Sequence, residues 1–276
     1  MNESFETSIK EYVSKHSPKL YILTPCYGSV CYANYVMSLM NTISILKQFQ
    51  ISYQIDFCCS DSLVSRARNN LIARAMSDPE MTHILFIDAD ITWNPQDVLK
   101  LLITNTYLVG GVYPLKKYNW TKMATDPNLV QKWVSTQKEN ELFQNYPTEQ
   151  YLQHKLLDYN VNHKSTELIV ENNLTEVKSI ACGFMMIKRE TLELLQKAFP
   201  STKYTDDVSF LKGNQNDYAY ALFDCGVENG HYLSEDWMFC SRWEKLGGKI
   251  FIDVTVNLSH TGVEHYHGSF LSSVLH

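Results

Sequence analysis

The stretch HILFIDADITWNP, residues 83–95, decides the predicted fold. Its first five residues, HILFI, form an almost continuous apolar run, which is typical of a strand that helices cover on both faces. Asn94 is a good N-cap and Pro95 a good first residue for a helix that follows. The stretch therefore predicts a buried strand that leads through a short acidic segment into a helix.

Strand and helix patterns alternate on both sides of this stretch. Short apolar runs predict strands, apolar stripes of helical spacing predict helices, and their order predicts an α/β protein with a mostly parallel, doubly wound central sheet flanked by helices. Residues about 117–175 are polar and predict an insertion within a single domain that spans residues 1–276. The predicted strands are 20–24, 54–58, 83–87, 107–112, 178–188 and 249–254, and the predicted helices are 31–49, 63–76, 95–103, 190–198 and 234–246.

The composition is that of a globular protein with a net negative charge. Asp and Glu number 30 against 24 Lys and Arg, so the formal charge is −6, and the chain lacks the basic field of nucleic-acid-binding proteins. No apolar run reaches the ~18 residues of a transmembrane segment, and the polar N-terminus shows no signal peptide. The seven cysteines include no Cys-x-x-Cys pair. We therefore expect a cytoplasmic protein with reduced thiols, no zinc site and no nucleic-acid partner.

Asp88 and Asp90 are the strongest candidates for a chemical role. They stand at i and i+2 at the end of an apolar strand, so their side chains project to the same side. Ligands of open α/β sheets bind outside the carboxyl ends of the strands, and paired carboxylates suit Mg²⁺ or Mn²⁺ with substrate phosphates. The alternative is that both residues only form the turn into the next helix.

Two further segments carry candidate residues. Ser234 is a predicted N-cap, and Glu235 and Asp236 follow in the first helical turn, where an anionic carboxylate is stabilised and available as a proton acceptor. Complementing the helix dipole alone would also explain these acids. After the last predicted strand, His260 is either structural or the imidazole that completes an Asp-rich metal site. His265 and His267 follow, and a solvated loop explains them as well as a metal does.

Arg66 is the basic residue that we single out. It shares a helix face with Asn70, and in an acidic protein it can contact a nucleotide or an aspartate, although a surface position is an equal alternative. No Gly-x-Gly-x-x-Gly, Walker A or Gly-x-Ser-x-Gly motif is present. Rossmann dehydrogenases, P-loop NTPases and α/β-hydrolases are therefore disfavoured.

Together these segments resemble one family, the nucleotide-sugar-dependent glycosyltransferases of the GT-A fold, in the group found in bacteria and in large DNA viruses. The resemblance covers the chain except its N-terminus and the insertion, and the segments occur in the family's order. They are TPCYG at 24–28, SLVSRARN at 62–69, HILFIDADITWNP at 83–95, VGGVYPLK at 109–116, ACGFMMIKR at 181–189 and the segment 222–262 with its LSED sequence.

The resemblance implies a metal site and a donor site. Asp88 and Asp90 would form the Asp-x-Asp motif, with Asp90 on Mn²⁺ or Mg²⁺ and Asp88 toward the ribose or the metal's waters. His260 would be the third protein ligand. The nucleotide-binding residues implied by the resemblance are Thr24, Pro25 and Tyr27 around base and ribose, Asp61 as a partner of the base, and Arg66 near the nucleotide or Asp88.

The resemblance also implies the catalytic groups. Asp236 would take the proton from the acceptor hydroxyl, and Glu235 would be its neighbour in the acceptor site. Gly183 would let the backbone approach the bound sugar or acceptor. A carboxylate opposite the leaving diphosphate fits an inverting transfer with one base. The alternative is a retaining transfer, which a product that keeps the donor's anomeric configuration would indicate.

We therefore expect a metal-dependent glycosyltransferase that moves a sugar from a nucleotide diphosphate sugar to a saccharide or other hydroxyl acceptor. The expected donor is a UDP-sugar. Its expected role is glycan biosynthesis, in the host cytoplasm if the protein is viral. Two alternatives stay open: a sugar nucleotidyltransferase and a non-catalytic nucleotide-sugar-binding protein. A sugar nucleotidyltransferase usually carries a Gly-rich N-terminal loop with Arg or Lys. The corresponding segment here, TPCYGSV at 24–30, contains no basic residue, which disfavours this alternative.

Overall fold

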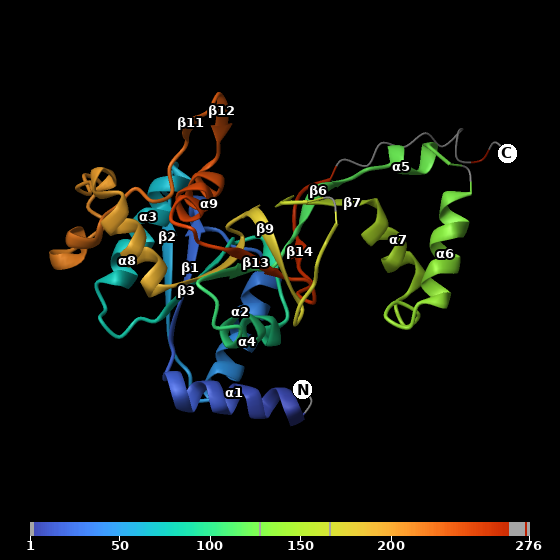
Figure 1. The fold of residues 1–276 in the computed structure, drawn as a ribbon, viewed down its shortest axis with the longest axis horizontal. Helices are drawn as coiled ribbons and strands as arrows, with labels where there is room; N and C mark the ends of the chain where they lie inside the picture. Colours follow the sequence, from blue (N-terminus) through green and yellow to red (C-terminus); the bar gives the residue numbers. More distant parts are fainter. Residues whose placement is uncertain (1–2, 127, 166, 265–273, 275–276) are drawn as a thin grey trace.

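The computed structural model describes residues 3–126, 128–165, 167–264 and 274, and a large sheet forms its centre (Figure 1). Among these residues the sheet has eight strands in the order β2-β1-β3-β10-β5-β13-β9-β8. Only β10 and β9 run against the other strands, so the sheet is mostly parallel, as predicted. In chain order the strands are β1 (Lys19–Cys26), β2 (Ser52–Cys59), β3 (His83–Ile87), β5 (Leu108–Gly110), β8 (Val161–His163), β9 (Leu174–Ile180), β10 (Phe184–Lys188) and β13 (Ile250–Asp253).

Helices cover both faces of this sheet, which confirms the predicted α/β architecture. On β3, Ile84 and Phe86 belong to one buried cluster, while Leu85 and Ile87 belong to the other. This alternation follows from the two-residue repeat of a strand. The first cluster includes side chains from α3 (Val64–Met76), α8 (Arg189–Ala198) and α9 (Glu235–Lys245), and the second from α1 (Glu3–His16), α2 (Ala33–Gln48) and α4 (Pro95–Ile103).

Two strand predictions need correction. The predicted strand at 178–188 is two strands, because the chain leaves β9 at Ile180 and enters β10 at Phe184, on another part of the sheet. β10 runs antiparallel between β3 and β5, where a purely parallel order would place these two side by side. The strand at 107–112 is shorter than predicted, since β5 ends at Gly110, where a Cβ would come within 2.6 Å of the Phe184 carbonyl oxygen.

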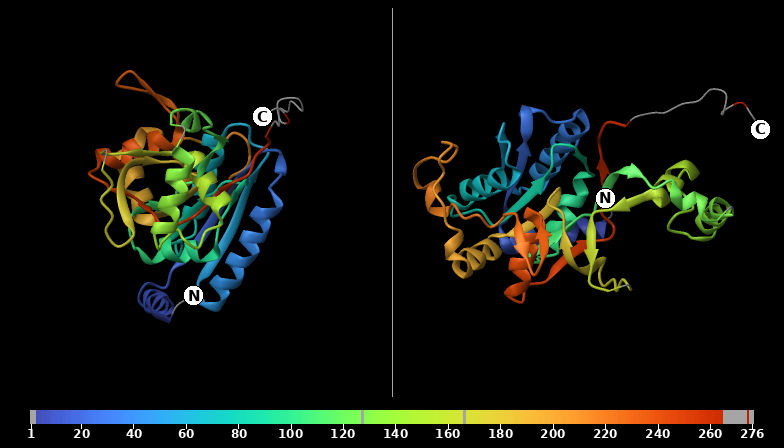
Figure 2. Two further views of the ribbon diagram at one scale, coloured as in Figure 1. Left: turned by 90° about the vertical axis from the view of Figure 1, so that its right-hand side faces the viewer. Right: turned by 90° about the horizontal axis from the view of Figure 1, so that it is seen from above.

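Most of the predicted insertion forms an arm that extends away from the central sheet, but its last part, with β8 and the start of β9, belongs to that sheet (Figures 1 and 2). Strands β6 (Pro114–Tyr118) and β7 (Leu157–Tyr159) pair as an antiparallel ribbon at its base. Beyond the ribbon lie α5 (Thr121–Ala124), α6 (Leu129–Glu139) and α7 (Thr148–Leu156). The chain then returns to the central sheet as β8. The remaining short strands are β4 (Ile91–Thr92), β11 (Gly226–Glu228), β12 (His231–Leu233) and β14 (Ser259–His260).

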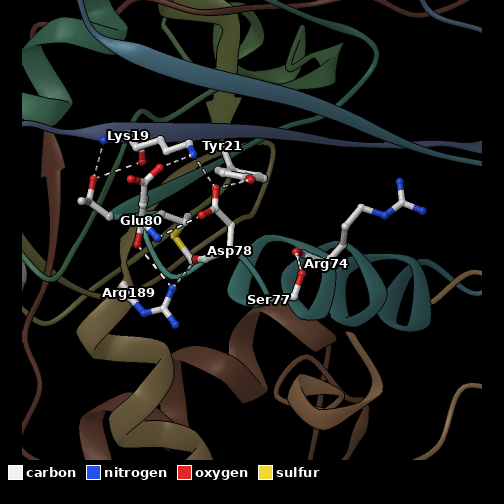
Figure 3. A network of polar contacts seen from close by, with 9 residues as sticks. Lys19, Tyr21, Arg74, Ser77, Asp78, Glu80 and Arg189 are labelled. Atoms are coloured by element: carbon white, nitrogen blue, oxygen red, sulfur yellow. Dashed lines mark hydrogen bonds and ion pairs between the residues drawn. The ribbon is translucent and has the colours of Figure 1, made fainter. Parts of the chain in front are cut away.

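A polar network connects the segments that meet at the amino end of β1 (Figure 3). Lys19 contacts Asp78 at 2.7 Å and Glu80 at 3.0 Å, and the Tyr21 hydroxyl donates to Asp78. Arg189, at the start of α8, donates to the Asp78 carbonyl at 2.8 Å. These bonds tie the loop after α3, the start of α8 and β1 together at the amino ends of the parallel strands.

Candidate active site

A cleft of about 330 Å³ lies at the carboxyl ends of β1, β2 and β3. The predicted acidic pair after β3 forms part of its wall, as expected for an open α/β sheet. The side chains that carry the argument below are in its lining: Pro25, Tyr27, Asp61, Arg68, Asp88 and Asp90.

Arg68 connects three parts of the chain beneath this cleft. It lies on α3 with only 4% of its surface exposed. Its Nη2 donates to Asp88 Oδ1 at 3.0 Å, and its Nε donates to Glu235 Oε1 at 3.4 Å. The guanidinium also lies over the Phe86 ring, 5.2 Å from its centroid. Burial lowers the pKa of Arg68, but Asp88 and Glu235 raise it by more, so the group stays a cation.

Asp90 faces two basic side chains. Its Oδ2 lies 2.5 Å from Lys116 Nζ and 3.5 Å from His260 Nε2. Burial raises the pKa of Asp90, but the contacts with His260 and Lys116 outweigh burial and lower it to about 2. Asp90 is therefore an anion throughout the physiological pH range.

The backbone orients His260 toward Asp90. β14 pairs with β4, which places His260 opposite Ile91, and the Thr261 amide donates to the Asp90 carbonyl at 2.9 Å. His260 Nδ1 lies 2.9 Å from the Pro114 carbonyl oxygen, which can only accept, so Nδ1 carries a proton. Nε2 faces the Asp90 carboxylate at 3.5 Å: a protonated Nε2 donates to it, whereas a neutral ring leaves a lone pair opposite the carboxylate. Two facing acceptors favour a cation between them.

The structure brings together two of the three predicted metal ligands. Asp90 and His260 converge, whereas the Asp88 carboxylate faces Arg68. Within the described ranges, no group of three or more His, Cys, Asp or Glu side chains could hold a metal ion. A carboxylate oxygen and an imidazole nitrogen suit Mn²⁺, and Mg²⁺ commonly takes its other ligands from phosphates and water. The pair therefore fits a divalent ion that shares its coordination with a phosphorylated ligand.

The acidic pair of α9 lies at the other side of Arg68. Ser234 occupies the N-cap position, but its hydroxyl donates to the Asp236 carboxylate and makes no cap hydrogen bond. Asp236 also accepts from the Trp237 amide at 2.8 Å. Burial raises the pKa of Asp236, and the nearby Glu235 adds to the shift. A raised pKa makes the Asp236 carboxylate a better proton acceptor than an ordinary aspartate.

Three predicted site residues are engaged with the protein itself. Thr24 is fully buried and shares a 2.5 Å hydrogen bond with Tyr35. Arg66 forms a bidentate pair with Asp61, at 2.8 and 2.9 Å, and the arginine that reaches Asp88 is Arg68.

Gly183 is also engaged with the protein. A Cβ on Gly183 would lie 2.6 Å from the Tyr113 ring, so the glycine makes room for that ring. Its carbonyl accepts from the Asp88 amide at 3.1 Å, which ties the start of β10 to the end of β3.

Three site residues were missed from the sequence. Arg68 interrupts the apolar stripe of α3 that includes Leu71 and Ile72, and a charge in such a stripe is a signal of a buried ion pair. Tyr113 packs edge-on against His260, and burial together with Asp88 raises its pKa. Lys116 has no sequence signal beyond its place after a strand. His265 and His267 lie outside the described residues.

The comparisons with known proteins find little sequence similarity. No protein-family model and no curated protein sequence matches the chain. Among solved structures, it is similar to A197 from STIV, with 18% identity, 89% of this chain and 86% of that chain covered, and a TM-score of 0.45. The inositol-1-phosphate CTP transferase from T. maritima shows 8% identity over 88% of each chain, with a TM-score of 0.38.

A third solved structure is the 4-diphosphocytidyl-2C-methyl-D-erythritol synthase from Anaerococcus prevotii. It shows 8% identity over 69% of this chain and 80% of that chain, with a TM-score of 0.29. These similarities are too low to carry a function, which has to rest on this chain's own residues. In the part of the chain that the structure describes, no helix is long and apolar enough to cross a membrane.

Proposed function

We propose that this protein is a GT-A-type glycosyltransferase of the cytoplasm. It moves a sugar from a nucleotide diphosphate sugar to a hydroxyl acceptor, and a UDP-sugar is the first candidate for the donor. The observation that carries the proposal is the Arg68 bridge. Its guanidinium bonds to Asp88, after β3, and to Glu235, at the start of α9, which lies 167 positions from Arg68 in the sequence. This bridge supports assigning the acidic end of β3 and the acidic pair of α9, which includes the proposed base Asp236, to one site.

The cleft supports the donor half of this proposal. Tyr27 is 75% exposed at its rim, which leaves its ring available to stack on a base. The Asp61 carboxylate lies in the same lining, oriented by Arg66. Asp88 lies between these groups and the α9 acids, where a ribose hydroxyl could donate to its remaining acceptor sites.

Asp90 and His260 are the residues that would hold a divalent cation in this enzyme. When bound there, Mn²⁺ or Mg²⁺ would supply neutralisation of the charge that develops on a leaving diphosphate. This ligand pair, with a phosphorylated partner completing the coordination, matches a donor that carries its own phosphate oxygens.

Asp236 is the proposed general base of an inverting transfer. The acceptor oxygen forms a bond to the anomeric carbon while the bond from that carbon to the diphosphate oxygen breaks. The hydroxyl proton passes to the Asp236 carboxylate, and the nucleoside diphosphate leaves with the bonding electrons. Ser234 and the Trp237 amide hold the carboxylate in one orientation through this step.

Calorimetric titration tests the donor assignment, with UDP, GDP and their glucose conjugates, each with and without Mn²⁺. We expect one nucleotide to bind in a metal-dependent manner. No binding of any of them to the folded protein would overturn the donor site. If pyrophosphate is released from a nucleoside triphosphate and a sugar phosphate, the protein is a nucleotidyltransferase instead.

Asp236→Asn tests the base, with the exposed Asp207→Asn as a matched control. We expect the first variant to bind the donor as the unmodified protein does and to lose transfer by roughly 10²-fold or more. The control should keep both properties. Full transfer by Asp236→Asn would remove Asp236 from the mechanism.

A further inference from the structure

Lys116 is placed at the oxygen that the proposed cation needs. It belongs to β6, at the base of the arm, and its Nζ contacts Asp90 Oδ2 at 2.5 Å. His260 Nε2 faces the same oxygen at 3.5 Å. A divalent ion and an ammonium group at one carboxylate oxygen repel each other strongly, because like charges a few ångströms apart at a partly buried site are only weakly screened by water. Lys116 and a divalent ion therefore compete for Asp90.

The Lys116 side chain has both a support and room to move. Its stem packs on Gly262, where a Cβ would come within 2.6 Å of Lys116 Cδ. The residue also lines a second cavity of about 490 Å³, together with Gly262, His260 and Lys117. The Lys116 side chain as a whole is 37% exposed, so it is not held in the interior. A long, flexible ammonium side chain in such a place can change partners without any change in the fold.

We propose that Lys116 is a displaceable counter-cation: it neutralises Asp90 before the divalent ion arrives, and it then pairs with the donor's diphosphate. The inference rests on the proposed function, since it assigns a further residue to the same donor site. Lys116 is then a positioning residue: it favours binding of the ion together with the donor over binding of the ion alone. The chemistry is a charge exchange, with one ammonium group passing from a carboxylate to a phosphate oxygen.

The two roles predict effects of opposite sign in one variant, Lys116→Met. Without its competitor, Mn²⁺ alone should bind about two- to fivefold more tightly. At saturating Mn²⁺, UDP should bind roughly tenfold more weakly, because a charge-assisted contact to phosphate is lost. Electron paramagnetic resonance measures free Mn²⁺ in the first titration, and calorimetry measures UDP binding in the second.

Lys117→Met is the matched control, since it removes the same charge one residue away, and it should shift either affinity by less than about twofold. Lys116→Arg keeps the charge and should stay within a few fold of the unmodified protein in both titrations. Circular dichroism confirms that each variant is folded.

Weaker or unchanged Mn²⁺ binding by Lys116→Met would overturn the counter-cation role, and unchanged UDP binding would overturn the diphosphate role. Equal effects of Lys116→Met and Lys117→Met on the two affinities would mean that only the loss of one positive charge near the site matters, and would overturn both roles. Failure of the proposed function is a separate result, because it would appear as absent nucleotide binding in the unmodified protein, while the Mn²⁺ titration would still report on Lys116 and Asp90.

Discussion

Replacing Arg68 by Met should destabilise the protein more than replacing its neighbour Arg66. Only 5% of the Arg68 side chain is exposed, and it separates two carboxylates, those of Asp88 and Glu235. Met keeps most of the apolar stem but removes the charge, so both carboxylates lose their partner in a poorly hydrated place. The substitution should therefore lower the stability of the fold as well as disturb the site.

The burial of the three groups sets the magnitude. Removing one partner from a buried ion pair costs about 3–5 kcal/mol. Glu235 is 14% exposed and Asp88 is 28% exposed, so some hydration remains and the lower end of that range applies. Loss of the cation over the Phe86 ring adds about 0.5–1 kcal/mol. We expect a total loss of about 3–4 kcal/mol in the free energy of unfolding.

Urea unfolding followed by circular dichroism measures this loss. With a slope of about 3 kcal/mol per molar urea for a chain of this size, the midpoint should fall by about 1 M. Arg66→Met is the comparison on the same helix: the Arg66 side chain is 37% exposed, so water can enter its place, but its partner Asp61 is only 6% exposed, and we expect a loss of about 1–2 kcal/mol. The double variant Arg68→Met, Glu235→Gln should recover part of the loss.

Equal midpoints for Arg68→Met and Arg66→Met would refute this account, because the two differ chiefly in burial. A double variant that is no more stable than Arg68→Met would show that repulsion involving Glu235 does not contribute. In that case the cost would come from packing around the missing guanidinium alone.

Two further predictions concern the site. Gly183→Ala should lower both stability and transfer, since its Cβ would push the Tyr113 ring from its position against His260; unchanged melting and unchanged transfer would contradict the close packing. The rate of transfer should fall on acidification as Asp236 takes up a proton, because only its anion accepts one. Burial raises the pKa of Asp236, so this decline in kcat/KM should begin above the ~3.9 of an ordinary aspartate. A flat profile down to that pH would exclude Asp236 as the base.

The sequence predicted a helix or strand well where the apolar pattern and the residues that begin or end the element are neighbours in the chain. The strand at 83–87 and the helix at 95–103 match β3 and α4. The Asn94 side chain caps that helix by accepting from the Gln96 amide, as predicted. α1 was missed, because it is polar apart from a few residues such as Ile9 and Tyr12 that pack on the body of the protein.

The sheet order could not be predicted from these patterns. The end of β9 and the whole of β10 lie in one largely apolar stretch of the sequence, and nothing local shows that the chain changes its place in the sheet near Gly183. Hydrophobic periodicity reports which side chains are buried, but the neighbours of a strand depend on contacts between distant segments. The antiparallel β10 between β3 and β5 is the consequence.

The sequence by itself determined the α/β class and placed Asp88, Asp90 and Asp236 at element ends, because strand and helix signals depend on neighbouring residues. Only the tertiary structure decided how these acids are paired. It selected Arg68 over Arg66 for Asp88, and it set Lys116 beside His260 at Asp90. The physical reason is that ion pairs form between side chains that packing brings within a few ångströms, and that proximity follows from the order of the strands.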